Sequence, residues 1–204
     1  LPEALRLERT DGRPEDRLRV AKTLTVSASL SQVTKKQLEN VRSMPDTCFV
    51  ELDPVELIKR TYALPDVMAA LAKEADKKHF VLFVDSSVNN REATKRLEAE
   101  LSIGKTEIGE AISGELGAIA REILGAYEDI NGLILTGGDT AKAVCNQLNM
   151  NQMQLCTEVE AGLPLGKLRG GADTREYWAV TKAGGFGNER SLMNALIYMS
   201  GEDE

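Results

Sequence analysis

The order of hydrophobic and polar residues along this chain follows two alternating repeats. Apolar and β-branched runs, alternating or uninterrupted, predict strands at 22–28, 47–52, 80–84, 133–135, 153–158 and 176–181. Apolar residues spaced three or four apart predict helices at 32–43, 55–60, 65–76, 106–127, 140–148 and 189–199. This alternation predicts an α/β fold: a single domain with a largely parallel or mixed sheet and flanking helices.

The predicted helix at 106–127 combines the clearest apolar stripe of the chain with three glycines. Gly109, Gly114 and Gly117 each weaken an isolated helix by up to about 1 kcal/mol relative to alanine. A close backbone contact with a partner helix or a ligand would account for them. The same helix is the candidate interface of a homodimer. Its stripe consists of Ile108, Ile112, Leu116, Ile119, Ile123 and Leu124.

Composition and charge argue against several classes of protein. The net charge of −7 argues against a nucleic-acid binder, which needs a basic surface, but permits a small phosphorylated ligand. No apolar run reaches the roughly 18–20 residues that cross a bilayer, and no signal peptide is visible, so we expect a cytoplasmic protein without a membrane partner. Cys48, Cys145 and Cys156 have neither a zinc spacing nor a disulfide framework and are expected to be reduced core thiols. The single histidine, His79, is expected to be structural, and no metal site is predicted.

The first residues have a different character from the rest. Residues 5–20 are dense in mixed charge and contain a glycine and a proline, which is typical of a linker or an interdomain crossover. The chain starts at Leu1 without an initiator methionine. We therefore expect a piece of a longer protein, with a linker or crossover at 1–21 and a folded domain at 22–204.

The segment 133–141 is the most informative stretch for function. It passes from an apolar strand through Gly137 and Gly138 into the start of a helix. A helix N-terminus offers backbone N–H groups and a partial positive charge to a phosphate, and glycines let the main chain approach a ligand closely. Asp139 or Thr140 can equally cap the helix. Alone, the segment leaves a binding turn and an ordinary helix cap open.

Three predicted strands end in small, flexible or hydroxyl residues just before a helix, at 27–31, 136–140 and 182–187. Ligands of open α/β sheets bind outside the carboxyl ends of the strands. Three such ends can converge on one crevice, where they would offer backbone N–H groups, hydroxyls and a lysine to an anion or a nucleotide.

Other motifs are less specific. Gly104-Lys105-Thr106 is similar to the end of a Walker loop, but that pattern needs a glycine where this chain has Ala99, so the tripeptide is assigned to the turn before the long helix. No Gly-x-Gly-x-x-Gly follows the first predicted strand, which disfavours a dinucleotide site. Met150 and Met153 flank a turn-like connection and are interpreted as core or gap-filling residues.

Four segments together resemble a known family. In chain order they read VSASLSQVTKKQ at 26–37, LILTGGDTAKAV at 133–144, EVEAGLPLGKL at 158–168 and VTKAGGFGNERSL at 180–192. This series is similar to the carboxy-terminal, nucleotide-binding domain of the four-carbon acid sugar kinases, over roughly residues 20–201. The resemblance implies a phosphotransferase of carbohydrate metabolism that uses ATP to phosphorylate threonate, erythronate or 3-oxo-tetronate.

The resemblance also implies a set of ATP contacts. Backbone N–H groups and hydroxyls suit a polyphosphate, and Mg²⁺ is expected to accompany the nucleotide, with Asp139 alternatively orienting a magnesium-bound water. Two positions depart from the family, which commonly has Gly-Ser at Ala28-Ser29 and Pro-Gly at Ala161-Gly162. A Cβ at position 28 tightens the first turn. The implied contacts are Ser29, Ser31, Gly137, Gly138, Asp139, Thr140, Gly184, Gly185 and Gly187.

In this family an amino-terminal domain holds the sugar acid and carries an Asp-Asp motif that supplies the base. Nothing in residues 1–20 matches that motif, so no catalytic residue is assigned. Phosphoryl transfer depends on positioning both substrates, and the chain alone is expected to transfer little phosphate. Two other interpretations stay open: a binding or regulatory module for a phosphorylated metabolite, and a structural domain whose glycines serve only turns.

Overall fold

The computed structural model describes residues 6–9, 18, 20–29, 31–172 and 174–201. In chain order its elements are β1 (Arg6–Arg9), β2 (Lys22–Ser27), α1 (Gln32–Val41), β3 (Thr47–Leu52), α2 (Pro54–Lys59), α3 (Leu64–Lys73), β4 (His79–Val84), α4 (Val88–Leu101), α5 (Lys105–Ala126), β5 (Ile130–Thr136), α6 (Gly138–Gln147), β6 (Met150–Glu158), β7 (Pro164–Gly170), β8 (Tyr177–Lys182) and α7 (Ser191–Ser200).

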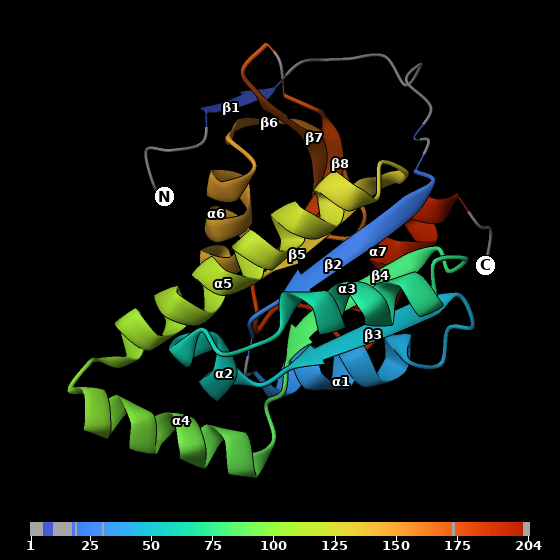
Figure 1. Cartoon of the computed structure of the whole chain (residues 1–204). Coiled ribbons are helices and arrows are strands. Elements are labelled where there is room, and N and C mark those ends of the chain that lie inside the picture. The colour runs from blue at the N-terminus through green and yellow to red at the C-terminus, as the bar shows by residue number, and fades with distance from the viewer. Residues whose placement is uncertain (1–5, 10–17, 19, 30, 173, 202–204) are drawn as a thin grey trace.

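The described strands form one sheet in the order β1-β6-β7-β8-β5-β2-β4-β3 (Figure 1). β7 runs antiparallel to β6 and β8, whereas every other pair is parallel. The predicted single-domain α/β fold with a largely parallel or mixed sheet is confirmed. From β2 the chain continues through α1 to β3, and from β5 it continues through α6 to β6 on the opposite side. The adjacent strands β2 and β5 therefore form a topological switch point, where open α/β sheets bind their ligands.

Helices cover both faces of this sheet. On one face α2, α3, α5 and α6 pack over a cluster that includes Leu24 and Leu82, and on the other α1 and α7 pack over a cluster that includes Val81 and Ile134. Side chains alternate between the two faces along a strand, so a strand between two helical layers has to be apolar almost throughout. β4 meets this condition, because every residue of His79–Val84 is buried.

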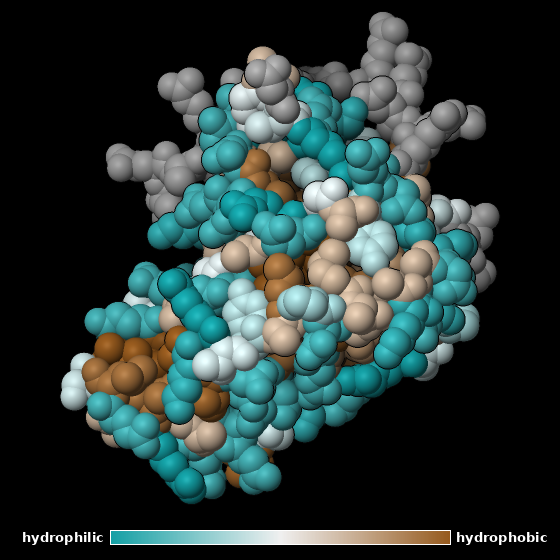
Figure 2. Space-filling model, viewed as in Figure 1, coloured by the Kyte–Doolittle hydropathy of each residue, from teal (hydrophilic) through white to brown (hydrophobic). Residues whose placement is uncertain are grey.

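The helix α4 differs from the others because it projects from one end of the sheet (Figure 1). Only Thr94 and Leu97 of this helix are buried, while the large apolar residues Val88 and Leu101 are exposed. Figure 2 shows hydrophobic side chains gathering where α4 meets the start of α5. With so few buried positions, the apolar spacing of this segment is too sparse to predict the bounds of α4.

The long helix α5 is confirmed, and its glycines have separate explanations. A Cβ on Gly117 would lie 2.9 Å from the carbonyl oxygen of Ala143, so this glycine lets α5 pack closely on α6. Gly109 and Gly114 have open space where a Cβ would stand, and Gly109 lines a cavity described below. The partner helix of Gly117 therefore lies within the chain. A homodimer through α5 stays a prediction, and the apolar stripe of α5 is buried inside this domain.

Three elements differ from the sequence-based expectations. β7 was not predicted, because its buried leucines, Leu165 and Leu168, are three residues apart and do not alternate as in a half-buried strand. β1 lies within the expected linker, yet it pairs parallel with β6 at the edge of the sheet. Met150 and Met153 are buried as expected, but both lie within β6 and not on either side of a turn. The division of the chain at residue 21 stays a prediction, and residues 1–5, 10–17 and 19 lie outside the described residues.

The cysteines and the histidine follow the burial of their strands and helices. Cys48 and Cys145 are buried free thiols, and burial raises the pKa of Cys145 to about 11. The expectation of a core thiol is wrong for Cys156, because the last residues of β6 extend into solvent and this thiol is exposed. The ring of His79 is buried with its Nδ1 atom 2.9 Å from the hydroxyl of Thr23, which agrees with a structural role.

The described residues contain neither a membrane-crossing helix nor a cluster of metal ligands. Among them, no helix has both the length and the apolar character that a membrane crossing requires. Within the same residues, no group of three or more His, Cys, Asp or Glu side chains is placed to hold a metal ion.

Candidate functional site

The three strand ends singled out from the sequence meet at one edge of the sheet. β2, β5 and β8 are adjacent and parallel, so their carboxyl ends lie side by side. The backbone N–H of Ala28 donates to Thr140 Oγ1 at 3.3 Å, and that of Gly137 donates to the carbonyl oxygen of Lys182 at 2.8 Å. The hydroxyl of Ser31 donates to the carbonyl oxygen of Gly184 at 2.7 Å. The three ends thus lie side by side as predicted, but in place of one crevice the described residues form two cavities, one on each side of the turn after β5.

The turn that follows β5, residues 136–140, is called the β5 turn below. Gly137 has a positive φ of 101°, which favours glycine, and it stands immediately before the first residue of α6. The interpretation of Asp139 or Thr140 as a helix cap is wrong: within the part of the chain that the structure describes, no side chain caps α6, and Thr140 instead accepts the backbone N–H of Ala28. A Cβ on Gly138 would meet nothing within 4 Å. The positive end of α6 therefore opens onto free space.

The turn that follows β8, residues 182–187, is called the β8 turn. The Nζ atom of Lys182 donates to the carbonyl oxygens of Ala183 at 2.9 Å and Phe186 at 3.2 Å, and burial lowers the pKa of this ammonium group to about 8. The Gln37 amide donates to the carbonyl oxygens of Phe186 at 3.1 Å and Asn188 at 2.7 Å. The carbonyl groups of this turn are thus directed into the protein, onto Lys182 and α1.

The glycines of the β8 turn are not equivalent. A Cβ on Gly184 would lie 2.7 Å from Ser29 Oγ, and one on Gly187 would lie 2.5 Å from Ser191 Oγ at a φ of 84°. Gly185 has open space instead. Because the carbonyl of Gly184 points at α1, the N–H of Gly185 in the same planar peptide points the opposite way. Packing explains Gly184 and Gly187, while Gly185 is the glycine of this turn with room for a ligand.

The serine segment after β2 is largely occupied by the fold. Ser31 caps α1 by accepting the N–H of Thr34 at 3.1 Å. The hydroxyl of Thr34 donates to the carbonyl oxygen of Gly184 at 2.5 Å, so both hydroxyls hold the β8 turn against α1. Ser29 lies 3.2 Å from Ser31 between their hydroxyl oxygens and also lines a cavity. Contacts of Ser29 and Ser31 with a ligand stay predictions.

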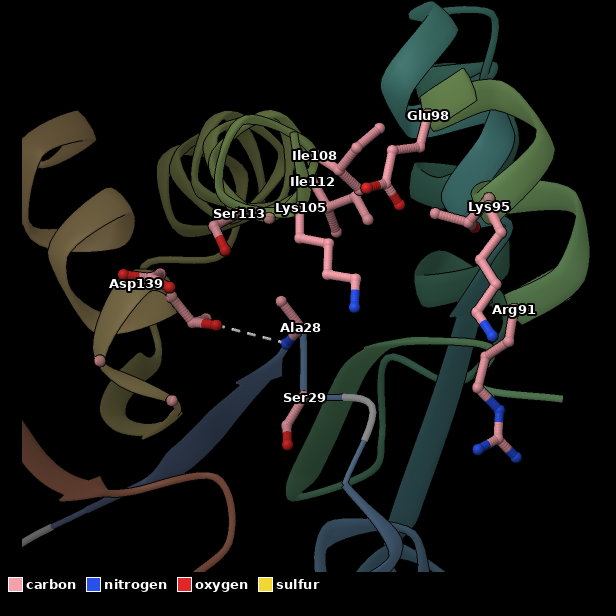
Figure 3. Close-up of a pocket in the computed structure, with 15 residues that line it drawn as sticks. Ala28, Ser29, Arg91, Lys95, Glu98, Lys105, Ile108, Ile112, Ser113 and Asp139 are labelled. Atoms are coloured by element: carbon pink, nitrogen blue, oxygen red, sulfur yellow. Dashed lines mark hydrogen bonds between the residues drawn. The ribbon is translucent and has the colours of Figure 1, made fainter. Parts of the chain in front are cut away.

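Two cavities flank the β5 turn, and Gly137 and Gly138 line both of them. The first, called the cationic cavity, measures about 390 Å³ and lies between this turn, α4 and the start of α5. Lys105 projects into it toward Ala28, and Arg91 and Lys95 extend from α4 on its other side (Figure 3). Two carboxylates, Glu98 and Asp139, share this lining. The second, called the apolar cavity, measures about 560 Å³ and lies between α6, β6 and β7, with Ala141, Met150, Met153, Pro164 and Leu168 in its lining.

Sequence reasoning missed Arg91 and Lys95 and assigned Lys105 to a turn. Lys105 is instead the first residue of α5, and its side chain faces the cationic cavity (Figure 3). Arg91 and Lys95 stand four residues apart, which places them on one face of a helix. That spacing was the available signal, and it is readable only once the bounds of α4 are known.

The carboxyl end of β6 lies at the same edge of the sheet. It leads into a turn in which Gly162 has a φ of 81°, and a Cβ there would lie 2.5 Å from the ring of Phe186. Gly162 also lines the apolar cavity. The segment 158–168 carries part of the family resemblance, and in the structure it forms one wall of the apolar cavity.

Comparison with known proteins shows which family this chain is similar to. A family model described as a nucleotide-binding C-terminal domain matches residues 24–192. The D-threonate kinase of Salmonella typhimurium is 28% identical over 188 residues, which cover 91% of this chain and 44% of that enzyme. The D-erythronate kinase of Heliobacterium modesticaldum is 29% identical over 184 residues, and these cover 87% of this chain and 42% of the enzyme. The chain thus spans less than half the length of these relatives.

Solved structures agree on the fold. A Haemophilus influenzae protein superimposes with a TM-score of 0.67 at 20% identity, covering 89% of this chain and 40% of that protein. A Bordetella bronchiseptica protein, crystallised with bound citrate as a domain-swapped dimer, superimposes with a TM-score of 0.66 at 22% identity. The match covers 88% of this chain and 41% of the Bordetella chain.

The family match covers every strand end that lines the site, from β2 to the start of α7. The matched relatives include kinases of the four-carbon sugar acids D-threonate, D-erythronate and 3-oxo-tetronate. The chain therefore belongs to the family of nucleotide-binding C-terminal domains, as found in the four-carbon acid sugar kinases.

Proposed function

We propose that this chain is the ATP-binding part of a kinase that phosphorylates a threonate-, erythronate- or 3-oxo-tetronate-type sugar acid. The observation that carries the proposal is the β5 turn, where an uncapped helix N-terminus opens beside Gly138 at the switch point of the sheet. Backbone N–H groups at a helix N-terminus and a close glycine approach suit the phosphates of a nucleotide.

The surrounding residues supply what phosphoryl transfer requires of a protein. The lysine and arginine side chains of the cationic cavity offset the negative charge of a polyphosphate. Thr140 and the β8 turn fix the position of the β5 turn through their hydrogen bonds to Ala28 and Gly137. Because these contacts hold the turn before a ligand arrives, binding should require little rearrangement.

Magnesium is expected to enter with the nucleotide, where it would neutralise phosphate charge. Asp139 is an exposed carboxylate in the first turn of α6 and lines the cationic cavity, so its oxygens fit a hard cation or the water bound to one. The role of the described residues is to bind and orient the phosphate donor.

The acceptor is proposed to bind outside these 204 residues. The chain matches 39–44% of the length of the three sugar-acid kinases that align over most of it, and the rest of each relative has no counterpart here. Since transfer depends on holding both substrates in line, we expect the chain by itself to bind ATP and transfer little phosphate. Measurement of ADP release with D-threonate, D-erythronate and 3-oxo-tetronate tests this, and robust turnover would contradict it.

A thermal-shift panel tests the choice of ligand. ATP with magnesium should raise the melting temperature through linkage, while four-carbon sugar phosphates should leave it unchanged. A response to sugar phosphates and none to ATP would instead favour a regulatory module for a phosphorylated metabolite, whose anion would use the same cationic cavity. No response to either class would favour a structural domain.

A further inference from the structure

We infer that the nucleotide lies across the β5 turn, with its phosphates in the cationic cavity and its base in the apolar cavity. The inference rests on the proposed ATP binding and adds an orientation to it. The two cavities meet at Gly137 and Gly138, which line both, so one extended ligand can occupy both by passing over these glycines. The open space at the Cβ position of Gly138 lies at this crossing.

The number of cationic side chains favours the cationic cavity for the phosphates. Three cationic side chains line it, Arg91, Lys95 and Lys105, against two carboxylates, Glu98 and Asp139. Figure 3 shows Lys105 reaching toward the carboxyl end of β2 between α5 and α4. The three cations come from two helices that meet at this cavity, and the N-terminus of α6 faces it as well. Cations and a positive helix end favour a polyphosphate at this side of the turn.

The apolar cavity suits a base better than it suits phosphate. Met150, Met153 and Leu168 are buried residues of its lining and offer apolar surface to the faces of a planar ring. Asn146 and Asn151 add amide groups that can both donate to and accept from the polar edge of a base.

Two lysines also line the apolar cavity, and one of them is already engaged. Lys182 is only 3% exposed, and its ammonium group donates to the carbonyl oxygens of its own turn. Lys142 is therefore the cation of this lining that stands on an exposed position of α6. Among the described residues, the apolar cavity thus offers one exposed cation and no carboxylate, whereas the cationic cavity offers three cations beside its two carboxylates. The larger number of cationic groups that can contact separate phosphates favours the triphosphate on the side of α4 and α5.

The test compares ATP with inorganic tripolyphosphate, both with magnesium, by isothermal titration calorimetry on the whole chain. The ratio of the two dissociation constants measures what the nucleoside adds to binding. The double variant Arg91→Gln/Lys105→Gln should weaken both ligands by at least about tenfold and leave their ratio unchanged. Arg96→Gln is the matched control, because Arg96 lies on α4, pairs with Glu92 and is absent from the lining of either cavity.

Asn146→Trp tests the other side. Asn146 is an exposed residue of α6, so the larger ring can enter the apolar cavity without displacing the core. This variant should weaken the binding of ATP by about tenfold or more and change the binding of tripolyphosphate by no more than about twofold. The ratio of the two dissociation constants should therefore move toward one. An unchanged melting temperature without ligand shows that the variant is folded.

The outcomes separate this inference from the proposal on which it depends. Wild-type chain that binds sugar phosphates but not ATP overturns both. Wild-type chain that binds ATP, with tripolyphosphate lost in Asn146→Trp and retained in the double variant, keeps the proposed function and reverses the orientation. ATP binding with no measurable tripolyphosphate binding, or ATP binding that neither variant changes, also overturns the orientation.

Discussion

The β5 turn and the β8 turn have similar small residues, but the structure uses them in opposite ways. The β5 turn opens outward: α6 has no side-chain cap, and Gly138 has free space around it. The β8 turn is directed inward, since its carbonyl groups accept hydrogen bonds from Lys182, Thr34 and Gln37. The difference shows that a glycine-rich strand end can present backbone to a ligand or can serve as the support that holds its neighbour in place.

The largest expected effect comes from closing the open turn. Gly138→Val should abolish the ATP-dependent thermal shift, because the new side chain would occupy the space that a phosphate needs. The fold should survive, since a Cβ at this position meets no atom within 4 Å and φ is not positive. Differential scanning fluorimetry with and without ATP and magnesium measures both effects.

The matched control for this change is Gly125→Val. Gly125 also has open space at its Cβ position, but it lies near the far end of α5 and lines neither of the cavities beside the β5 turn. This variant should keep the full ATP shift. A normal shift in Gly138→Val would remove the β5 turn from the site.

The second prediction concerns the packing of the β8 turn. Gly187→Val should destabilise the protein by about 2 kcal/mol or more, because valine is strained at a φ of 84° and its Cβ would overlap Ser191 Oγ. Gly185→Val, in the same turn but with open space, should change the free energy of unfolding by much less. Urea unfolding of both variants provides the comparison, and equal losses would show that the turn is not held by packing at Gly187.

The third prediction concerns the charge buried under the β8 turn. Burial lowers the pKa of Lys182 to about 8, against about 10.4 in an unfolded chain. Below pH 8 both states carry the proton and the fold bears the whole cost of burying the charge. Between pH 8 and about 10.4 the unfolded chain binds more protons, so the contribution of Lys182 to stability rises with pH.

Lys182→Met removes this titration. The stability of the wild-type chain relative to this variant should rise by about 1–2 kcal/mol between pH 8 and 10, within the limit of about 1.4 kcal/mol per pH unit for one proton. The difference in free energy of unfolding between the wild-type chain and the variant removes the contributions of other groups that titrate in this range. Urea unfolding at several pH values measures it, and a difference that does not change with pH would mean that Lys182 titrates normally.

The smallest effect is expected from one hydroxyl of the support. Thr34→Val keeps the shape of a fully buried side chain and removes the donor to the carbonyl oxygen of Gly184. The free energy of unfolding should fall by about 1 kcal/mol, the usual net value of such a hydrogen bond. The binding of ATP should weaken only slightly, because Ser31 still donates to the same carbonyl oxygen. Thr106→Val, at an exposed position of α5, is the control and should be neutral.

The sequence was sufficient where a single segment carries its own signal. The uninterrupted apolar run of β4 and the stripe of α5 predicted their elements, because burial on both faces or on one stripe leaves a direct mark on composition. β1 left no such mark: its residues, Arg6–Arg9, are mostly charged, and the strand exists through its pairing with β6.

The site follows the same division. The β5 turn was recognisable from its glycines, whereas Arg91 and Lys95 depend on how α4 is placed against the rest of the fold. The inward direction of the β8 turn was equally hidden, because it results from contacts of Lys182 and Gln37 that no local pattern specifies. The homodimer, the cytoplasmic location and the ATP contacts of the individual residues stay predictions.

The hydrogen bonds at this edge of the sheet also have a consequence for the order of folding. Ala28 and Thr140 are 112 positions apart in the chain, and Ser31 and Gly184 are 153 apart. Contacts between such distant residues are slow to form, because a long loop has to close before they stabilise anything. During synthesis, a chain that has not yet added β8 can contain every residue of the β5 turn and still lack the support behind it. Nucleotide binding by this domain would then report that the last strand has joined the sheet, and would stabilise only chains that have completed that step.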